Sequence, residues 1–381
     1  MEAQPVIELL DTEAALRLPP QPETWAEFAR QHVVAMLSDG IRHYVDNVDA
    51  GLSLLRVDEQ LLPIVVARRD GSIDRLRPAA AVVSPRSHYV DYTREELAKR
   101  HPDAPNWLLA LAFWPLNTVI RVGELGRVVH VNNWLLTTNP TTRYTETQLS
   151  GLIDCLTATH PTSAIVFRGL MTLLHADQIR LFRRAGFRLV RYRRVWIVED
   201  CERACHESPE LRRDLRLLKR HGYEVVDEPE IMAAEAERLA DLYRDLYLGK
   251  HSRLNPHFNA EFIRLTLREG LLTYRIFRKD DSIDAVKAWY TRDGLMTGAF
   301  VGHDRRKPRA IGLYRQAMAL QFSEAARLGF KLHLSGGAGE FKRLRGATPH
   351  EEYEAVWDRH LSPRRRLPWA MLEWAGRAVA G

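Results

Sequence analysis

The sequence is poor in cysteine. It contains only Cys155, Cys201 and Cys205, an odd number with no C-x-x-C pair. Small secreted domains held together by disulfides carry an even and denser set, and zinc knuckles need paired cysteines. The cysteine content therefore excludes a disulfide framework, argues against a zinc knuckle and is typical of a protein in a reducing cytoplasm.

Long apolar runs are also missing. A helix needs ~20 consecutive apolar residues to cross a bilayer, and no stretch of this sequence approaches that length. Residues 1–5 carry no basic segment ahead of an apolar one, so a signal peptide is not indicated. We expect a cytoplasmic protein without stable membrane insertion, and the oligomeric state stays open.

Motifs for nucleophilic and metal-dependent catalysis are absent as well. The sequence has no G-x-S-x-G, no H-E-x-x-H and no phosphate-binding G-x-x-x-x-G-K-[ST]. We therefore predict no metal site. If the chain is an enzyme, its reaction is expected to proceed without an enzyme nucleophile.

The composition is that of a globular protein. Of the 381 residues, 45% are hydrophobic and 27% are charged, which are ordinary values for a folded chain. This length suits two domains better than a single core. The net charge of +6 and the pI of about 9.2 permit a polyanionic partner such as tRNA, CoA or anionic lipid without requiring one.

Two stretches of the chain repeat the same order of elements. Each has a helix, a strand, a second helix that ends before a glycine, and another strand. In order, these segments are residues 149–156, 164–167, 176–185 and 187–198, and residues 313–328, 330–334, 341–345 and 352 onward. The repetition predicts two copies of one α/β unit.

Apolar runs predict further strands ahead of each copy. They are residues 52–57, 62–67, 79–84 and 128–136 before the first copy, and 223–226, 272–277, 284–290 and 296–301 before the second. Between the two halves, Ser208 and Pro209 are a typical helix start. The helix that follows is the expected joint between the lobes.

The segment from 330 to 361 is the most informative. Phe330, Leu332 and Leu334 alternate with polar residues, as in a strand with one buried face. Residues 335–339 read Ser-Gly-Gly-Ala-Gly, so a ligand or another backbone can approach closely. The spacing is not G-x-G-x-x-G. From spacing alone, a tight turn is therefore favoured over a phosphate site.

Residues 335–347 read S-G-G-A-G-E-F-K-R-x-R-G-A, and the segments Glu352-Tyr353, Val356-Trp357 and Arg359-His360-Leu361 follow. This pattern resembles the C-terminal end of the tandem GNAT acyltransferases. That group includes the Fem-type (FemABX) aminoacyl-tRNA-dependent transferases and their CoA-dependent acetyltransferase relatives. The resemblance implies an α/β fold with mixed sheets and two tandem GNAT-like lobes. The implied segments are a degenerate N-terminal lobe at 1–204, a basic linker helix at 205–222 and a catalytic C-terminal lobe at 223–381.

In the Fem group, a Phe-Lys pair at this place reaches the reaction centre, and the matching residues are Phe341 and Lys342. Direct transfer to an amine needs charge stabilisation at the carbonyl oxygen, and a lysine can provide it. We expect the Lys342 ammonium to point between the loops 336–339 and 309–314, and Lys342→Met to change stability little. Without the motif, an exposed helix lysine would be the favoured interpretation.

Other side chains are candidates for roles near the reaction centre. Tyr290 and Tyr314 are possible proton donors, although a buried tyrosine with a satisfied hydroxyl is the alternative. His251, Asn255 and His257 lie in a polar segment and are predicted to line the acceptor pocket. Polar surface is the alternative for this group.

The loop before residue 313 is the predicted donor-binding loop. GNAT enzymes carry R/Q-x-x-G-x-G/A there, and its amides hold the pyrophosphate of CoA. The match is Arg309-Ala-Ile-Gly312-Leu-Tyr314, in which a tyrosine replaces the last small residue. This departure favours aminoacyl-tRNA over acyl-CoA. A bulky residue at Gly312 is expected to weaken donor binding more than folding. The predicted donor-binding residues are Arg309, Gly312, Ser335, Gly336 and Gly337.

The helix that begins after Ser208 is strongly basic. Its cations are Arg212, Arg213, Arg216, Lys219 and Arg220. They form either a tRNA-binding face or an ordinary solvated face, and both interpretations stay open.

These patterns predict an acyltransferase that moves an aminoacyl group from aminoacyl-tRNA onto an amine of a small molecule by direct transfer. An acyl-CoA-dependent N-acetyltransferase is the alternative with another donor. A non-catalytic nucleic-acid-binding module is the alternative from another class. The acyl group and the acceptor are not specified by the sequence.

Overall fold

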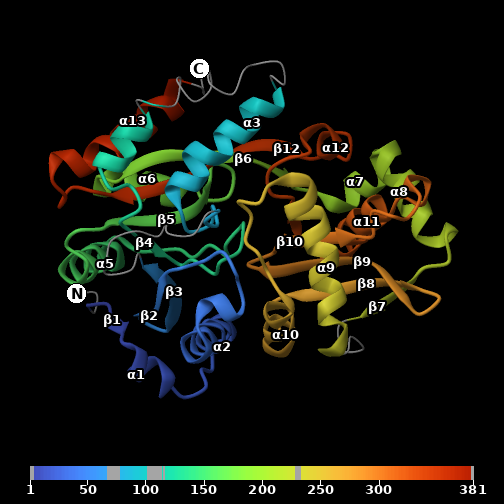
Figure 1. The fold of residues 1–381 in the computed structure, drawn as a ribbon, viewed down its shortest axis with the longest axis horizontal. Helices are drawn as coiled ribbons and strands as arrows, with labels where there is room; N and C mark the ends of the chain where they lie inside the picture. Colours follow the sequence, from blue (N-terminus) through green and yellow to red (C-terminus); the bar gives the residue numbers. More distant parts are fainter. Residues whose placement is uncertain (1–3, 67–77, 101–113, 115, 228–232, 379–381) are drawn as a thin grey trace. The chain divides into compact units, whose positions relative to one another are not determined.

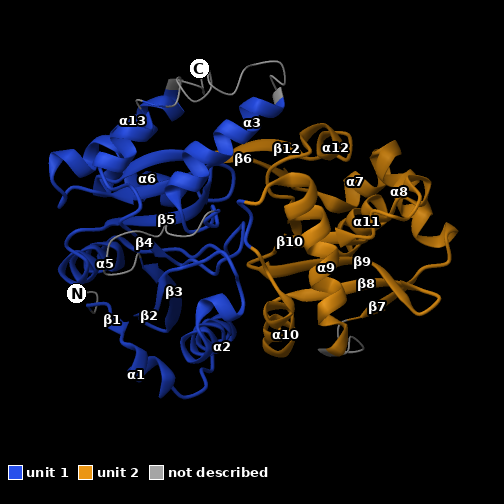
Figure 2. Cartoon of the chain, viewed as in Figure 1, with its two compact units in different colours: residues 1–192, 254–256, 352–381 blue, residues 193–253, 257–351 orange. Residues whose placement is uncertain are grey.

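The computed structural model describes residues 4–66, 78–100, 114, 116–227 and 233–378. The chain divides into two compact units (Figure 2). Unit 1 comprises residues 1–192, 254–256 and 352–381, and unit 2 comprises residues 193–253 and 257–351. No helix in the described ranges combines the length and the apolar character needed to cross a membrane.

Unit 1 contains a mixed sheet and helices from both ends of the chain (Figure 1). Its strands are β1 (Ile7–Leu10), β2 (Gly51–Val57), β3 (Gln60–Val66), β4 (Val128–Val131), β5 (Ala164–Met171) and most of β12 (Thr348–Trp357). Its helices are α1 (Thr12–Leu16), α2 (Thr24–Asp39), α3 (Thr93–Arg100), α5 (Glu146–Thr159), α6 (Ala176–Ala185) and α13 (Pro363–Ala378), with a π-helical turn at Ser87–Tyr92.

The strand order in unit 1 is β1-β2-β3-β4-β5-β12. The pairs are antiparallel except β4 with β5, which are parallel and joined through α5. Successive residues of β4 point to opposite faces, and Val129 joins the core under α5 and α6. Val128 joins a second core that includes Trp369 of α13. Helices therefore cover both faces of this sheet.

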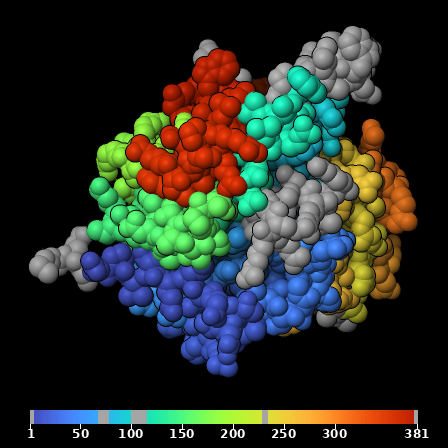
Figure 3. Space-filling model, turned by 60° about the vertical axis from the view of Figure 1, so that its left-hand side comes forward, coloured from blue at the N-terminus to red at the C-terminus, as the bar shows by residue number. Residues whose placement is uncertain are grey.

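The C-terminal helix α13 is an integral part of unit 1. Trp369 is 1% exposed and packs in the same cluster as Val166 of β5. Arg365 donates a hydrogen bond of 2.6 Å to the backbone oxygen of Thr162. In the space-filling view, the red surface of α13 borders the green surface of the residues ahead of β5 (Figure 3).

Unit 2 has its own mixed sheet. Its strands are residues 193–198 of β6 (Arg188–Val198), β7 (Glu224–Asp227), β8 (Thr273–Lys279), β9 (Ser282–Arg292), β10 (Leu295–His303) and β11 (Lys331–His333). Its helices are α7 (Cys201–Glu207), α8 (Pro209–Arg220), α9 (Ala236–Leu246), α10 (Ala260–Glu269), α11 (Leu313–Arg327) and α12 (Gly339–Arg343), with 3-10 turns at Ala233–Glu235 and Arg309–Ile311 and a π-helical turn at Tyr247–His251.

The strand order in unit 2 is β6-β11-β10-β9-β8-β7. Only β10 and β11 are parallel, and they are joined through α11. Phe300 of β10 contacts the ring of Tyr243 in α9, whereas Val301 packs with Ala317 of α11. Since adjacent strand residues face opposite ways, α9 and α11 cover opposite faces of this sheet.

The predicted α/β class with mixed sheets is confirmed, and the repeat seen in the sequence has a structural counterpart. Each unit has antiparallel strands followed by one parallel pair that is joined through a helix. The compact units nevertheless do not follow the sequential segments 1–204 and 223–381. Residues 193–198 of β6 belong to unit 2, where Ile197 and Val198 pair with β11, and residues 352–357 of β12 pair with β5 in unit 1.

The strand predicted at residues 79–84 is wrong, because this segment forms turns. The backbone oxygen of Ala80 accepts from the amides of Val83 and Ser84 within the turn, and the next oxygens accept from side chains. Val83 accepts from His130 at 2.9 Å, and Val82 accepts from Asn133 at 2.9 Å. The apolar run therefore reflects burial of a turn and not strand pairing.

Candidate functional site

The most irregular part of the unit 2 sheet lies where β10 leaves β11. Their parallel register ends with Thr297 opposite His333, while β10 continues to His303. On the other side, the register with β9 shifts between Gly298 and Phe300, which leaves Ala299 as a bulge. Bulges occur often beside active sites, because they change the direction of a strand and of its side chains.

The loop after β11 turns back sharply over residues 335–338. Ser335, Gly337 and Ala338 have φ of 59°, 69° and 45°. Residues other than glycine seldom adopt this left-handed backbone conformation. Helix α12 starts immediately afterwards. A Cβ at Gly339 would lie 2.6 Å from the Trp196 ring, so glycine is required for this close approach.

Lys342 of α12 is buried against this loop, with 3% of its surface exposed. Its Nζ donates hydrogen bonds to the backbone oxygens of Leu334, Ser335 and Gly336, at 2.6, 3.1 and 2.6 Å. The ammonium thus points at the loop backbone and not into open space between two loops. The left-handed turn is the reason, because it directs three successive carbonyls to one point.

This arrangement changes the expected effect of Lys342→Met on stability. The substitution removes three hydrogen bonds and leaves buried carbonyl oxygens without the Nζ donor. A buried unsatisfied polar group costs about 1–3 kcal/mol. A loss of stability is therefore expected, in contrast to the small change predicted for an ammonium that points into the space between two loops.

Two buried lysines lie close together here. Burial, together with the positive charges of Arg193 and Lys287, lowers the pKa of Lys342 to about 7. Lys287 of β9 is 3% exposed, and burial lowers its pKa to about 7. The hydrogen bonds from Lys342 to three carbonyls act in the opposite sense, since they favour the ammonium form.

Stability is expected to rise with pH between about 7 and about 10.5 because of these lysines. Below pH 7 each is protonated in the folded and the unfolded chain. Above it the folded chain releases protons that the unfolded chain retains up to the ordinary lysine pKa, so deprotonation favours folding. Urea unfolding at pH 6, 7.5 and 9 should show a smaller rise for Lys287→Met than for the wild type. Lys331→Met, at a half-exposed lysine in β11, is the control and should keep the full rise.

The aromatic partner of Lys342 is fixed by a buried ion pair. Arg345 donates from Nε and Nη2 to one oxygen of Asp214, at 2.8 and 2.6 Å, and from Nη1 to the backbone oxygen of Phe341 at 2.7 Å. Its guanidinium lies 3.5 Å from the centroid of the Phe341 ring. Tyr314 packs edge-on against the same ring, with 5.2 Å between centroids. Phe341 therefore packs between Tyr314 and Arg345, and the catalytic roles of Phe341, Lys342 and Tyr314 stay predictions.

Asp214 and Arg345 were not singled out from the sequence. A signal was present, because Asp214 lies on the same helical face as Leu211, Leu215 and Leu218 in α8. An acidic residue on the apolar face of a basic helix indicates a buried partner. Arg345 is the last charged residue of the F-K-R-x-R motif.

The remaining donor-loop residues differ in exposure. Arg309 is exposed in its 3-10 turn, and Gly312 has φ of 70° at the start of α11. A Cβ at Gly312 would lie 2.9 Å from Arg315 and 3.1 Å from Leu217. A bulky residue there is therefore expected to disturb folding as well as donor binding. The prediction that donor binding is weakened more than folding does not follow from this geometry.

The candidate acceptor residues belong to different units. His251 is exposed, and His257 shares a hydrogen bond of 2.8 Å with the backbone oxygen of Arg253, both in unit 2. Asn255 belongs to unit 1, where its backbone oxygen accepts from Asn47 at 3.0 Å. Tyr290 is buried in β9 opposite Thr297 of β10, two residues before the bulge at Ala299. The acceptor pocket stays a prediction.

The basic face of α8 is open to solvent. Leu211 and Asp214 are buried, whereas all five predicted tRNA-binding cations are exposed. Arg213 forms a long ion pair of 3.4 Å with Glu210. The geometry therefore permits contact with a polyanion, and it equally permits a solvated face.

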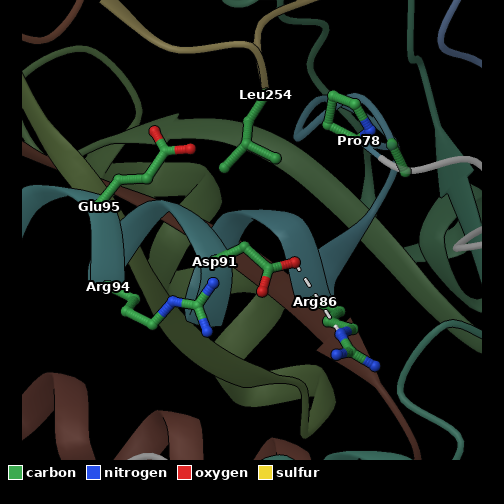
Figure 4. A pocket seen from close by; sticks show the side chains of 7 residues that line it. Pro78, Arg86, Asp91, Arg94, Glu95 and Leu254 are labelled. Atoms are coloured by element: carbon green, nitrogen blue, oxygen red, sulfur yellow. Dashed lines mark ion pairs between the residues drawn. The ribbon is translucent and has the colours of Figure 1, made fainter. Parts of the chain in front are cut away.

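Unit 1 contains a pocket of about 370 Å³ that the sequence did not indicate (Figure 4). Its lining residues are Pro78, Ala79, Arg86, Asp91, Arg94, Glu95 and Leu254. Arg86 and Asp91 are 3.9 Å apart across it. The pocket presents two cations and two carboxylates, so its charge does not favour one ligand class. Among the described side chains, no group of three or more His, Cys, Asp or Glu is arranged to hold a metal ion.

A scan against protein-family models and a search of curated proteins give no match. Solved structures do resemble the chain. FemX aligns over 97% of this chain and 100% of its own, with a TM-score of 0.52 and 8% identity. A tandem GNAT protein from the clavulanic acid biosynthesis pathway aligns over 93% and 98%, with a TM-score of 0.41 and 9% identity. The C-terminal domain of a putative lysylphosphatidylglycerol synthetase from Agrobacterium fabrum aligns over 61% and 77%, with a TM-score of 0.45 and 14% identity.

The FemX alignment extends over nearly the whole of both chains. At 8% identity the alignment shows a shared fold, but it gives no information on the reaction or the substrates. The chain therefore shares the fold of FemX, in agreement with the predicted Fem-type fold.

Proposed function

We propose that this chain, which has the tandem-GNAT fold, is an acyltransferase that moves an acyl group directly onto an amine. The observation that carries the proposal is the position of Lys342. It is a buried lysine whose ammonium is held against the loop that follows β11, just beyond the point where the parallel register of β10 and β11 ends. This combination suits a reaction in which negative charge develops on a carbonyl oxygen.

The reaction needs few participating groups. The neutral amine attacks the acyl carbonyl carbon, a C–N bond forms, and the bond from that carbon to the donor oxygen or sulfur breaks. The proton that the amine loses goes to the leaving atom. Lys342 stabilises the transient negative charge when one of its N–H groups turns from a loop carbonyl to the carbonyl oxygen.

The favoured donor is aminoacyl-tRNA. Tyr314 occupies the place of a small residue in the predicted CoA loop and is packed against Phe341. The exposed cations of α8 offer a face for phosphates, which would supply salt-dependent affinity. Acyl-CoA is the alternative, supported by Gly312 at the start of α11, where helix amides are available to an anion.

Analysis of co-purified ligand tests the donor assignment. Protein isolated at low salt is extracted, and the extract is examined for tRNA by gel and sequencing and for CoA thioesters by mass spectrometry. We expect intact tRNA, whose recovery falls when Arg212, Arg216 and Arg220 are replaced by glutamine. A CoA thioester without tRNA would instead favour the acetyltransferase alternative. RNA binding with no transfer by the wild type, in assays with both donor classes, would favour the non-catalytic module.

A further inference from the structure

A second cluster of buried polar groups lies beside the bulge, on the side of α11. Lys287 of β9 and Gln321 of α11 both approach Gly298 of β10. A Cβ built on Gly298 would lie 2.9 Å from Lys287 Nζ, 3.3 Å from Gln321 Nε2 and 3.4 Å from Gln321 Oε1. Glycine at position 298 therefore lets these three polar atoms pack closely over its Cα, where a methyl group would clash with Lys287.

These atoms have few partners of their own. Among the described residues, the one hydrogen bond of Lys287 Nζ is a long one of 3.4 Å to the backbone oxygen of Phe300. Gln321 is 0% exposed, and neither polar atom of its side chain has a partner in the described part of the chain. Buried side-chain amides nearly always have partners, so the Gln321 amide has one donor and one acceptor atom that a bound group could satisfy.

The charge at this place is positive. Neither Lys287 nor Lys342 has an ion pair among the described residues, and Arg193 adds to the positive field at Lys342. A buried cation without a counter-ion costs several kcal/mol. An anionic ligand would remove most of that cost.

Access to the cluster requires a side chain to move. Lys287 and Gln321 are 3% and 0% exposed, whereas Gly298 keeps part of its surface exposed. A ligand would therefore enter beside the glycine when the flexible end of Lys287 swings away from it. Gln321 lies on α11, whose first turn follows the predicted donor loop at 309–312. The ligand that enters here is accordingly expected to come from the donor.

We propose that Lys287, Gln321 and Gly298 form a subsite for a carboxylate at the end of the donor's acyl group, so that the enzyme selects an acidic acyl group such as aspartyl, glutamyl or succinyl. The Lys287 ammonium binds one carboxylate oxygen and Gln321 Nε2 binds the other. Gln321 Oε1 then accepts from the ammonium. This inference rests on the proposed function for the identity of the ligand as an acyl group, but the carboxylate site itself does not.

Thermal unfolding with small carboxylates tests the subsite. The wild type is heated at pH 6, where Lys287 is charged, with sodium succinate or sodium acetate against sodium chloride of equal ionic strength. Propionamide is the neutral probe. We expect the carboxylates to raise Tm by about 2–6 °C when they are well above Kd, and propionamide to have no effect.

The variants localise the effect. Lys287→Met keeps the stem and removes the charge, so the carboxylate shift should vanish while Tm without ligand stays equal or rises. Gly298→Ala places a methyl group against the flexible end of Lys287 and should reduce the shift. Gly51→Ala, in β2 of unit 1, meets only ordinary contacts at 3.5 and 3.8 Å and is the control. Lys331→Met is the charge control.

Several outcomes overturn the proposal. No carboxylate shift in the wild type, an equal shift in Lys287→Met, or an equal shift with propionamide each exclude a carboxylate subsite. Failure of the proposed function looks different. In that case the carboxylate shift and its loss in Lys287→Met remain, while no acyl donor supports transfer. If transfer occurs, the wild type should prefer an acidic acyl donor to a neutral one of the same length at least tenfold, and Lys287→Met should abolish the preference.

Discussion

Replacing Lys342 with methionine is expected to slow acyl transfer about a hundredfold to a thousandfold, which corresponds to roughly 3–4 kcal/mol of barrier. The variant keeps most of the stem volume and loses the charge that, in the proposed mechanism, turns from the loop carbonyls to the developing oxyanion. Single-turnover transfer, with donor and acceptor both saturating, measures the effect on the chemical step. Donor affinity should fall only modestly, because the lost interaction is made chiefly in the transition state.

The buried position of Lys342 makes stability controls necessary. Lys342→Met is assayed at a temperature where unfolding curves show that it is fully folded. Lys331→Met, on the neighbouring strand, controls for the loss of a positive charge. Lys342→Arg keeps the charge and tests whether charge alone restores the rate. A rate for Lys342→Met within about threefold of the wild type would mean that Lys342 only organises the loop at 335–338.

Replacing Asp214 with alanine is expected to destabilise the protein by about 3–5 kcal/mol. Asp214 and Arg345 are 2% and 6% exposed and are joined by hydrogen bonds of 2.6 and 2.8 Å. Without Asp214, the Arg345 guanidinium remains buried with no carboxylate beside it. Urea unfolding followed by tryptophan fluorescence measures the loss. Arg315 cannot compensate, because it is a cation that itself lies 3.6 Å from Asp214.

The double variant separates the loss of attraction from the burial of an unpaired charge. Asp214→Leu with Arg345→Met removes both charges and fills the volume, so it should recover much of the stability. Glu340→Ala breaks an exposed ion pair on α12 and is the control, with little change expected. Equal losses in the single and double variants would show that packing, and not the unpaired charge, decides the stability here.

Local patterns in the sequence were sufficient for much of the secondary structure. The helix expected at 313–328 is α11 at Leu313–Arg327, and the glycines expected to end helices, Gly186 and Gly346, have φ of 92° and 84°. These features depend on neighbours within a few residues, through helical spacing and left-handed caps. The repeat of helix, strand, helix and strand was visible for the same reason.

Contacts between distant segments required the tertiary structure. The sequence placed Phe341 and Lys342 together because they are adjacent, but it did not show that Lys342 would be buried under three carbonyls. A lysine on a short helix has the same local sequence pattern whether its side chain faces solvent or a loop. Its burial depends on the left-handed turn at 335–338, which precedes it in the chain and folds back over it.

The need for tertiary contacts also explains why the sequence did not indicate the second cluster of buried polar residues. Lys287, Gly298 and Gln321 lie on three different elements, and each is unremarkable within its own strand or helix. Only the pairing of β9 with β10 and the packing of α11 bring their polar atoms to one point. Likewise, the periodicity of β6 and β12 identified both as strands, but it did not identify the strands with which they pair. A strand pattern shows which face of the strand is buried, and it does not show which neighbouring strand lies along its edge.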